Sequence, residues 1–417
     1  MKNSGLKFLA ATFAAASIPA LFGWDLVISM DRSDGKYKVG ETATFTIKAT
    51  GDDIPEVQLE AKLSVDSGKV LKAEKFAVKD GLTISGTLDK PGFLKVAVDT
   101  YAAKKRIKKL KGAAFEAEKI LPGAESPADF KSFWDAEIAA AEKTPLDAQV
   151  KELEKSSVPG KYKCYSVSVA APGGRVYGFL TVPESDKPMP LVVMLPASGG
   201  DRVAPVVNQF GNKWAVLYMN VTDADPLKAD FGVIRRKIAK NYPFLNSQDK
   251  TKYFFHRVIL GFNRAINLVA ERKDIDKNKI GVFGTSQGGG LSLMIGAINP
   301  HIKGIVADVP AMCDHFAASQ GRRAGWPRLV NPRVPGSEIT AKYYDVANFA
   351  KLITVPTWVI VGFEDDTCPP GSVYAAFNQI PAEKKVMIDE PDKGHSNSPS
   401  YGNAVGLMRT MVLRSNN

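Results

Sequence analysis

The 417-residue sequence has few of the residues on which disulfide and metal chemistry depend. It contains four histidines and only three cysteines, Cys164, Cys313 and Cys368. An odd and sparse set of cysteines argues against a disulfide framework, so Cys313 and Cys368 are expected to be buried thiols rather than a bridge. No clustered set of His, Cys and carboxylate ligands is visible in the sequence. We therefore expect no metal and no cofactor.

Long hydrophobic runs are scarce as well. Residues 1–23 carry Lys2 and Lys7 and then an alanine-rich apolar run at 8–22, which is typical of a secretory signal peptide. The run is short for a membrane span, and no second stretch of spanning length follows it. The mature chain is therefore expected to be soluble and exported, either periplasmic or extracellular, with no membrane contact after removal of the signal.

Acidic residues are outnumbered: 55 Lys and Arg stand against 44 Asp and Glu, which gives a formal charge of +11. Part of this excess is concentrated in residues 104–111, where six of eight positions are Lys or Arg. Such a run is usually a solvated edge strand, since lysines discourage pairing with other sheets. No nucleic-acid-binding motif accompanies it, so no nucleic-acid partner is expected.

The region 24–118 is predicted to be an immunoglobulin-like β-sandwich. Short segments there largely alternate apolar with polar residues and are separated by turn signals; they cover 26–29, 44–49, 57–63, 82–86 and 93–98. No cysteine pair supports an antibody-like domain, and nothing catalytic stands out. The sandwich is therefore either a carbohydrate-contacting module or a spacer, and the spacer is the favoured reading.

The remainder, 119–417, alternates strands with helices after a linker at 121–127. A helix is expected at 128–142, and another with Phe255, Ile259, Phe262, Ile266 and Val269 on its buried face. Strand signals cover 164–169, 176–182, 191–195, 215–219, 280–283, 304–307, 357–361 and 385–388. The first two resemble an edge hairpin and the later ones are continuous apolar runs. This order predicts an α/β fold with a doubly wound, mostly parallel sheet whose site lies at the carboxyl ends of the strands.

The strongest functional motif is a Gly-x-Ser-x-Gly stretch formed by Gly284, Ser286 and Gly288. It lies between the strand at 280–283 and an apolar helix at 291–298, where a nucleophile elbow requires small neighbours around a strained serine. The amide of Gln287, at the start of the helix, would face a developing oxyanion. We expect Ser286 to be a nucleophile, although a structural turn has the same pattern.

A serine nucleophile needs a base and an acid, which in this architecture follow it in the order acid, then histidine. His395 lies shortly after the last strand signal and is preferred as the base over His315. For the acid, Glu364, Asp365 and Asp366 all follow the strand at 357–361 and compete. One of them would fix the imidazole tautomer, and the other two are expected to form a solvated acidic turn.

The second oxyanion donor is expected in the loop after the strand at 191–195. Residues 196–200 read Pro-Ala-Ser-Gly-Gly, so small side chains leave the amides accessible. Ser198 is the preferred donor. Every catalytic candidate lies after residue 118, and the chemistry is therefore predicted to be complete without the sandwich.

Several motifs in this order resemble the acetyl xylan esterase and cephalosporin-C deacetylase family. They are Pro127-Ala-Asp-Phe-Lys-Ser-Phe-Trp134, Gly284-Thr-Ser-Gln-Gly-Gly289, Ala307-Asp-Val-Pro-Ala-Met-Cys-Asp314, Tyr344-Asp-Val-Ala-Asn-Phe-Ala350 and Gly362-Phe-Glu-Asp-Asp-Thr-Cys-Pro-Pro370. The resemblance covers roughly residue 127 onward. In the family the acid lies three residues before Cys-Pro-Pro, which selects Asp365. The resemblance implies an α/β-hydrolase that removes acetyl groups from the sugar hydroxyls of oligo- or polysaccharides, often as a ring-shaped homo-oligomer.

Two positions depart from the family's pattern. Thr222-Asp-Ala224 replaces an Arg-Gly-Gln stretch, and Ser396 replaces the glutamate that usually follows the histidine. Both bear on pocket shape, acyl-group preference and assembly, whereas Ser286, Asp365 and His395 are all present. Two rival functions remain at this point. One is the hydrolysis of another ester or a peptide bond, and the other is carbohydrate binding by a non-catalytic, decayed hydrolase.

Overall fold

The computed structural model describes residues 23–102, 105–199, 203–207, 210, 212–238, 241–396 and 398–414. The predicted signal peptide thus lies outside the described residues except for Gly23. Within the described part, no helix is both long and apolar enough to cross a membrane.

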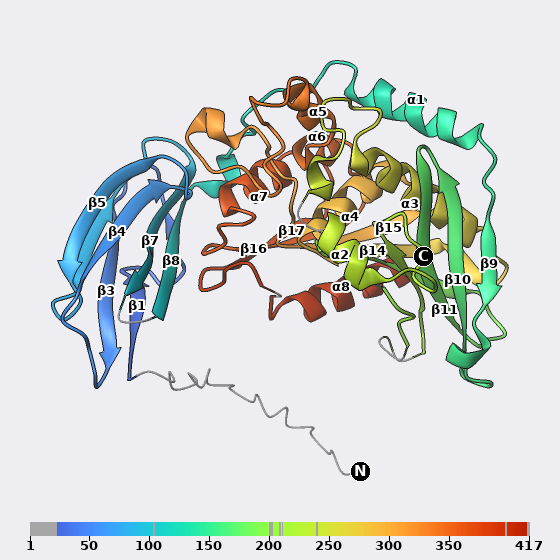
Figure 1. Ribbon diagram of the computed structural model, residues 1–417, viewed down its shortest axis with the longest axis horizontal. Helices are drawn as coiled ribbons and strands as arrows, with labels where there is room; N and C mark the ends of the chain where they lie inside the picture. The colour runs from blue at the N-terminus through green and yellow to red at the C-terminus, as the bar shows by residue number, and fades with distance from the viewer. Residues whose placement is uncertain are drawn as a thin grey trace, which may run out of the picture.

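The first part of the chain forms two packed β-sheets, which Figure 1 shows in blue and teal. In order across the sheets, β1 (Trp24–Met30), β3 (Ala43–Gly51) and β6 (Leu82–Gly86) form one, and β2 (Lys36–Tyr37), β8 (Lys105–Phe115), β7 (Gly92–Ala102), β4 (Gln58–Val65) and β5 (Val70–Ala77) form the other. Alternate residues such as Phe45, Leu63 and Val96 fill the space between the sheets. This confirms the predicted all-β sandwich. The sequence pattern missed β5, because Val70 and Leu71 at its start are exposed.

The second part is built on a nine-stranded sheet, counted over the described residues. Its order is β17 (Lys385–Glu390), β16 (Thr357–Gly362), β15 (Ile302–Asp308), β14 (Ile275–Thr285), β12 (Met189–Leu195), β13 (Ala215–Asn220), β11 (Gly174–Pro183), β10 (Tyr162–Ala171) and β9 (Gln149–Glu152). The strands from β17 to β13 are parallel to one another, and β11, β10 and β9 pair antiparallel. The predicted hairpin and mostly parallel sheet are confirmed, but the hairpin is not at the edge, because the short strand β9, which was not predicted, pairs with β10 and forms the edge itself.

Helices cover both faces of this sheet (Figure 1). Leu191 and Val193 of β12 face a core shared with α1 (Phe130–Glu142), α3 (Phe254–Ala270), α4 (Gln287–Ile298), α6 (Val346–Ala350) and α7 (Pro370–Phe377). Val192 faces a second core with α8 (Tyr401–Arg414). This alternation explains why the strand reads as a continuous apolar run. Of the two shorter helices, α5 (Ser337–Tyr343) contributes Ala341 and Tyr343 to the first core, whereas no described residue of α2 (Phe231–Ile238) belongs to either core.

Burial also bears out two finer expectations. The five residues that were expected on the inner face of α3 are completely buried. All three cysteines are free and buried, as expected for Cys313 and Cys368.

The sandwich packs directly against the second part of the chain, beside the β16 and β17 end of the large sheet (Figure 1). Phe93 of β7 belongs to the same hydrophobic core as the sheet and its helices. Its ring lies edge-on to Phe363, with the two centroids 5.1 Å apart. Lys36, in β2, forms an ion pair with Asp389 of β17 at 2.7 Å.

The interpretation of the basic run 104–111 as a solvated edge strand is wrong for Lys111, which is buried; Lys108 is exposed but has a carboxylate partner in the second part of the chain. Lys108 forms an ion pair with Asp366 at 2.7 Å, and Lys111 lies 3.2 Å from Glu364. The run does form a strand, but part of its charge is matched by carboxylates that lie far away in the sequence. Lys104 itself lies outside the described residues.

Candidate active site

Ser286 lies at a sharp turn between β14 and α4. Its backbone has φ 58° and ψ −119°, a conformation that costs a non-glycine residue free energy. Three hydrogen bonds hold it there: its amide donates to the Asp308 carbonyl at 2.8 Å, and its carbonyl accepts from the amides of Gly290 and Ala311. The strand, the strained serine and the helix are the arrangement of a nucleophile elbow.

The glycines of the elbow allow other backbone segments to approach closely. A Cβ at Gly288 would lie 2.2 Å from the Leu195 carbonyl oxygen, and one at Gly290 would lie 2.3 Å from that of Ala311. Both distances are too short for any side chain. Close approach of other backbone segments therefore explains why glycine stands at both positions.

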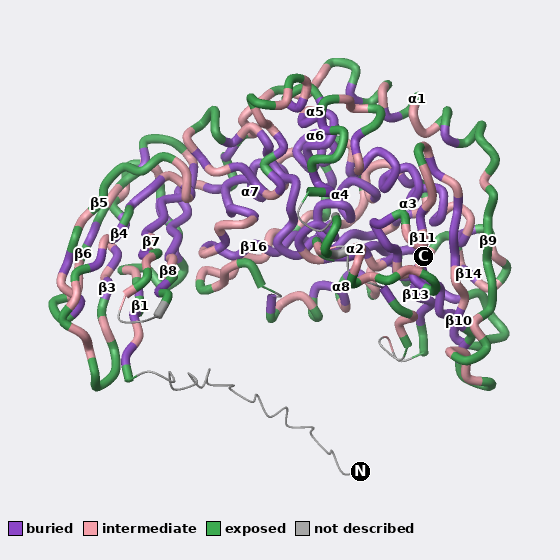
Figure 2. Tube along the Cα trace, in the orientation of Figure 1, coloured by how far each residue is buried: buried purple, intermediate pink, exposed green. Residues whose placement is uncertain are grey.

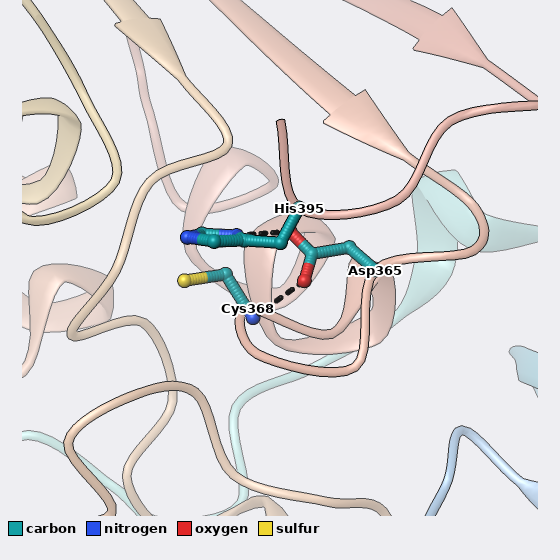
Figure 3. A group of neighbouring side chains, drawn as sticks. All are labelled: Asp365, Cys368 and His395. Atoms are coloured by element: carbon teal, nitrogen blue, oxygen red, sulfur yellow. Dashed lines mark hydrogen bonds and ion pairs between the residues drawn. The ribbon is translucent and has the colours of Figure 1, made fainter. Parts of the chain in front are cut away.

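Three side chains from separate elements meet at this turn in one hydrogen-bonded chain. Ser286 Oγ lies 2.9 Å from His395 Nε2, and His395 Nδ1 lies 2.7 Å from Asp365 Oδ2. Asp365 is held in turn, because its other oxygen accepts from the amides of Thr367 and Cys368 at 2.8 and 2.9 Å. Figure 3 shows the carboxylate between the imidazole and the Cys368 amide.

The surroundings of these three side chains make the imidazole of His395 more basic. Asp365 is fully buried, whereas the side chain of His395 is 25% exposed. Burial disfavours the charged imidazole, but the hydrogen bond and the charge of Asp365 outweigh it and raise the pKa of His395 above 6.5. With Nδ1–H donating to the carboxylate, Nε2 is left to accept a proton from Ser286.

Asp308 is a further carboxyl at the site that the sequence analysis did not consider. It ends β15, and one of its oxygens accepts from the Thr285 hydroxyl at 3.0 Å. Burial raises the pKa of Asp308 to about 6. A signal was available, because Asp308 stands at the carboxyl end of the strand next to the elbow, where the fold places its site.

The other histidines have different surroundings. His256 Nε2 lies 2.8 Å from Glu137 on α1. His315, the alternative base, is buried, and burial lowers its pKa to about 4. The imidazole that the fold brings to Ser286 is that of His395.

The two carboxylates beside Asp365 do not form the solvated turn that was expected. Glu364 and Asp366 lie in a short segment, residues 363–369 between β16 and α7, which we call the acid turn. Their partners are Lys111 and Lys108 of the sandwich. Only Asp365 among the three reaches the imidazole.

The residues expected to bind an oxyanion lie on the two segments that flank Ser286. Gln287 is the first residue of α4, and its side-chain amide donates to the Pro196 carbonyl at 3.2 Å. The hydroxyl of Tyr242 donates to the other end of the same side chain at 2.5 Å. These bonds tie the elbow to the loop that carries Ser198. Ser198 is exposed, and its amide donates to no other described residue.

One group of potential metal ligands is found among the described residues, and it includes two of the three side chains that are hydrogen-bonded to one another at the elbow. Ligand atoms of Asp365, Cys368 and His395 lie within 4.8 Å of one another (Figure 3). Burial raises the pKa of the Cys368 thiol well above its ordinary value, so this sulfur stays protonated. Asp365 and His395 already bond each other. The group is therefore better suited to proton transfer than to metal binding.

The fold and the elbow define an α/β-hydrolase. The chain belongs to the acetyl xylan esterase (AXE1) family, whose model matches residues 116–407, and it is accordingly a carboxylic ester hydrolase. It is 28% identical over 392 residues to the acetyl esterase Axe7A of Xylanibacter ruminicola, with 91% of this chain and 88% of that protein covered. The family resemblance seen in the motifs is thereby confirmed.

Solved structures agree on the fold. An acetyl xylan esterase from Paenibacillus sp. R4 is 24% identical with a TM-score of 0.60, and the match covers 71% of this chain and 98% of that one. Acetyl xylan esterase 1 from Thermoanaerobacterium sp. JW/SL YS485 is 23% identical with a TM-score of 0.61, and 72% and 98% are covered. Both structures are thus matched over almost their full length by less than three quarters of this chain.

Proposed function

We propose that this protein is a serine esterase that removes acetyl groups from the hydroxyls of carbohydrates, and that Ser286, His395 and Asp365 are its catalytic triad. The observation that carries the proposal is the unbroken hydrogen-bonded chain from Asp365 through His395 to a serine at a strained elbow. The family membership and the acetyl esterase relative support acetyl as the acyl group that is transferred. The alternative of a non-catalytic binding protein presupposes a triad that fails to converge, and this one converges.

The geometry supports two-step acyl transfer. His395 Nε2 takes the proton of Ser286 as its oxygen attacks the acetyl carbonyl, and Asp365 stabilises the imidazolium that forms. Collapse of the tetrahedral intermediate breaks the bond to the sugar oxygen, which leaves with the proton from His395. Water then attacks the acetyl-serine with the same imidazole as base, which releases acetate and restores the serine.

The negative oxygen of both tetrahedral intermediates needs donors that are already in place. We assign this role to the backbone amides of Gln287 and Ser198. The Gln287 amide lies at the N-terminus of a 12-residue helix, where unpaired amides and the helix dipole favour negative charge. The hydrogen bonds from the Gln287 side chain to the Pro196 and Ala197 carbonyls would hold the two donors in register.

The pH dependence follows from the base. Because the pKa of His395 is raised above 6.5, the imidazole becomes protonated, and unable to accept a proton, already at mildly acidic pH. We expect kcat/KM for a small acetyl ester to fall on acidification with a midpoint above pH 6.5. A profile that stays flat down to pH 5 would contradict the role of His395.

Acetate release from a substrate panel tests the reaction. The panel comprises acetylated xylan and xylo-oligosaccharides, a 4-nitrophenyl acetate and butyrate pair, an unrelated alkyl ester and a peptide amide. We expect turnover of the acetylated carbohydrates and preference for acetate over butyrate. Hydrolysis of the peptide or of the unrelated ester in preference to every acetyl ester would support the rival hydrolase reading instead.

The division of the chain and its location are part of this proposal. A sandwich at 24–118 and a catalytic domain at 119–417 are supported by the end of β8 at Phe115 and by the start of the family match at residue 116. A signal peptide at 1–23 would export the enzyme to its polymer substrate. Assembly into a homo-oligomer, which the family resemblance implies, would be tested by light scattering on the full mature chain.

A further inference from the structure

Strand β7 of the sandwich is buried on both of its faces. Leu94, Val96 and Val98 point into the sandwich core, whereas Phe93 belongs to the hydrolase core. Residues 92–96 are consequently buried without interruption (Figure 2). A strand on the surface of a free sandwich would expose every second residue. The hydrolase part therefore covers the outer face of β7.

Lys95 is a charged residue on that covered face. Its side chain is 0% exposed, and its ammonium lies 3.5 Å from Asp66 Oδ1, which is equally buried. The ammonium also donates a hydrogen bond to the main-chain carbonyl of Asp365. A buried ammonium is costly unless it is paired and hydrogen-bonded. This cost is offset by one ion pair within the sandwich and by one hydrogen bond to the residue that bears the triad's carboxylate.

Further contacts of the sandwich lie on or beside the same acid turn. Asp66 Oδ2 accepts from the Gly371 amide at 2.8 Å, in the first turn of α7. Gly112, the partner of Lys95 across β7 and β8, approaches Phe363 so closely that a Cβ would lie 2.3 Å from its carbonyl oxygen. With the lysine pairs of Glu364 and Asp366, the sandwich holds the turn before, at and after Asp365.

We propose that the sandwich is part of the catalytic apparatus and that Lys95 is a positioning residue, which fixes the backbone of Asp365 so that its carboxylate orients His395. The inference rests on the proposed triad and deepens it. The carboxylate has little freedom relative to its own backbone, because its Oδ1 is bonded to the amides of Thr367 and Cys368. Displacement of the Asp365 carbonyl would therefore move the carboxylate itself.

This inference reverses the expectation that the chemistry is complete without the sandwich. The expectation was based only on the sequence positions of the catalytic candidates, all of which lie after residue 118. The contacts show that residues before the linker hold one of those candidates in place. A spacer or a separate carbohydrate-contacting module would not place a buried lysine on the acid turn.

The test is Lys95→Met in the full chain, since methionine keeps much of the length and removes the ammonium. We expect kcat on 4-nitrophenyl acetate to fall about 10- to 100-fold, the size of effect that a displacement of about 1 Å produces, with little change in KM. The rate is to be expressed per active site, counted from the final extent of labelling by a serine-directed fluorophosphonate. This count separates a slower site from a smaller folded fraction.

Lys109→Met is the matched control. Lys109 lies on β8 but pairs within the sandwich, with Asp25 at 2.7 Å, and so should leave kcat within about twofold of wild type. The double variant Lys95→Met with Asp66→Asn guards against misfolding. Burial raises the pKa of Asp66, although the charges of Lys95 and Arg322 oppose the shift. Without Lys95 the buried Asp66 carboxylate would lose its ion-pair partner, and replacement by the neutral asparagine avoids this. We expect the double variant to fold and to be as slow per site as the single variant.

The outcomes separate this inference from the proposed function. If Ser286→Ala abolishes turnover while Lys95→Met turns over at the wild-type rate per labelled site, the triad stands and the positioning role is wrong. The same conclusion follows if Lys95→Met loses labelled sites only, because its role is then structural. If Ser286→Ala retains turnover, the proposed function itself is wrong.

Discussion

Ser286→Ala is expected to abolish esterase activity and to leave the fold unchanged. In serine hydrolases the loss of the nucleophile lowers kcat on the order of 10⁶-fold, and the residual rate comes from substrate binding and the oxyanion donors. Here the loss should be as complete, because no other hydroxyl or thiol of the described residues is bonded to His395. The measurement is turnover of 4-nitrophenyl acetate and release of acetate from acetylated xylan.

Retention of the fold can be expected from the surroundings of Ser286. The alanine variant keeps the backbone bonds to Asp308, Gly290 and Ala311 that hold the strained turn. It loses only the hydroxyl, whose partner His395 is partly exposed and can bond water instead. Circular dichroism and the melting temperature should match wild type within a few degrees. Substantial turnover by a folded alanine variant would remove Ser286 from the mechanism.

Asp365→Asn is expected to lower kcat about 10⁴-fold, as in triads whose orienting carboxylate becomes an amide. Asparagine can still accept from the Thr367 and Cys368 amides through its oxygen. Its NH₂ group would then face His395 Nδ1 and favour the tautomer that carries its proton on Nε2. In that tautomer the imidazole cannot accept the proton of Ser286.

Asp366→Asn is the matched control for this substitution. Asp366 is the next residue and carries the same charge, but its partner is Lys108 rather than the imidazole. Its loss should change kcat by no more than a few-fold, because partly exposed ion pairs contribute little free energy. In Asp365→Asn the residual activity should also persist to lower pH, since the group that raises the pKa of His395 is gone. Larger effects at Asp366 than at Asp365 would show that the acid is assigned to the wrong carboxylate.

Much of the fold and the centre of the site follow from local sequence. The apolar runs predicted the parallel strands, because strands covered on both faces need apolar residues at every position. The elbow was visible for a similar reason. Gly284, Gly288 and Gly290 stand close together in the sequence, so the motif is visible without the fold. In the fold, backbone atoms lie within 3 Å of where their Cβ atoms would be. His395 could be preferred because chain order in this architecture places it after the last strand.

Contacts between distant parts of the chain could not be predicted in this way. Glu364, Asp365 and Asp366 are adjacent carboxylates, and their chemistry does not say which one meets the imidazole. The family resemblance selected Asp365, and the folded chain places it there. Asp308 was not considered although its place at the end of a strand was a signal, and its contact with Thr285, 23 residues away, is visible only in the fold.

The sequence by itself thus determined the two-part architecture, the hydrolase sheet and the serine elbow, since each depends on the periodicity or the backbone needs of neighbouring residues. Only the tertiary structure decided what the basic run and Lys95 do. Lys95 lies 270 positions before Asp365, to whose main-chain carbonyl it donates a hydrogen bond. A contact of this kind leaves no periodicity and no spacing in the sequence, because a lysine can bond any carboxylate or main-chain carbonyl that packing brings to it. The selection is made by the packing of β7 and β8 against the end of the large sheet, which buries one lysine beside the carbonyl of Asp365.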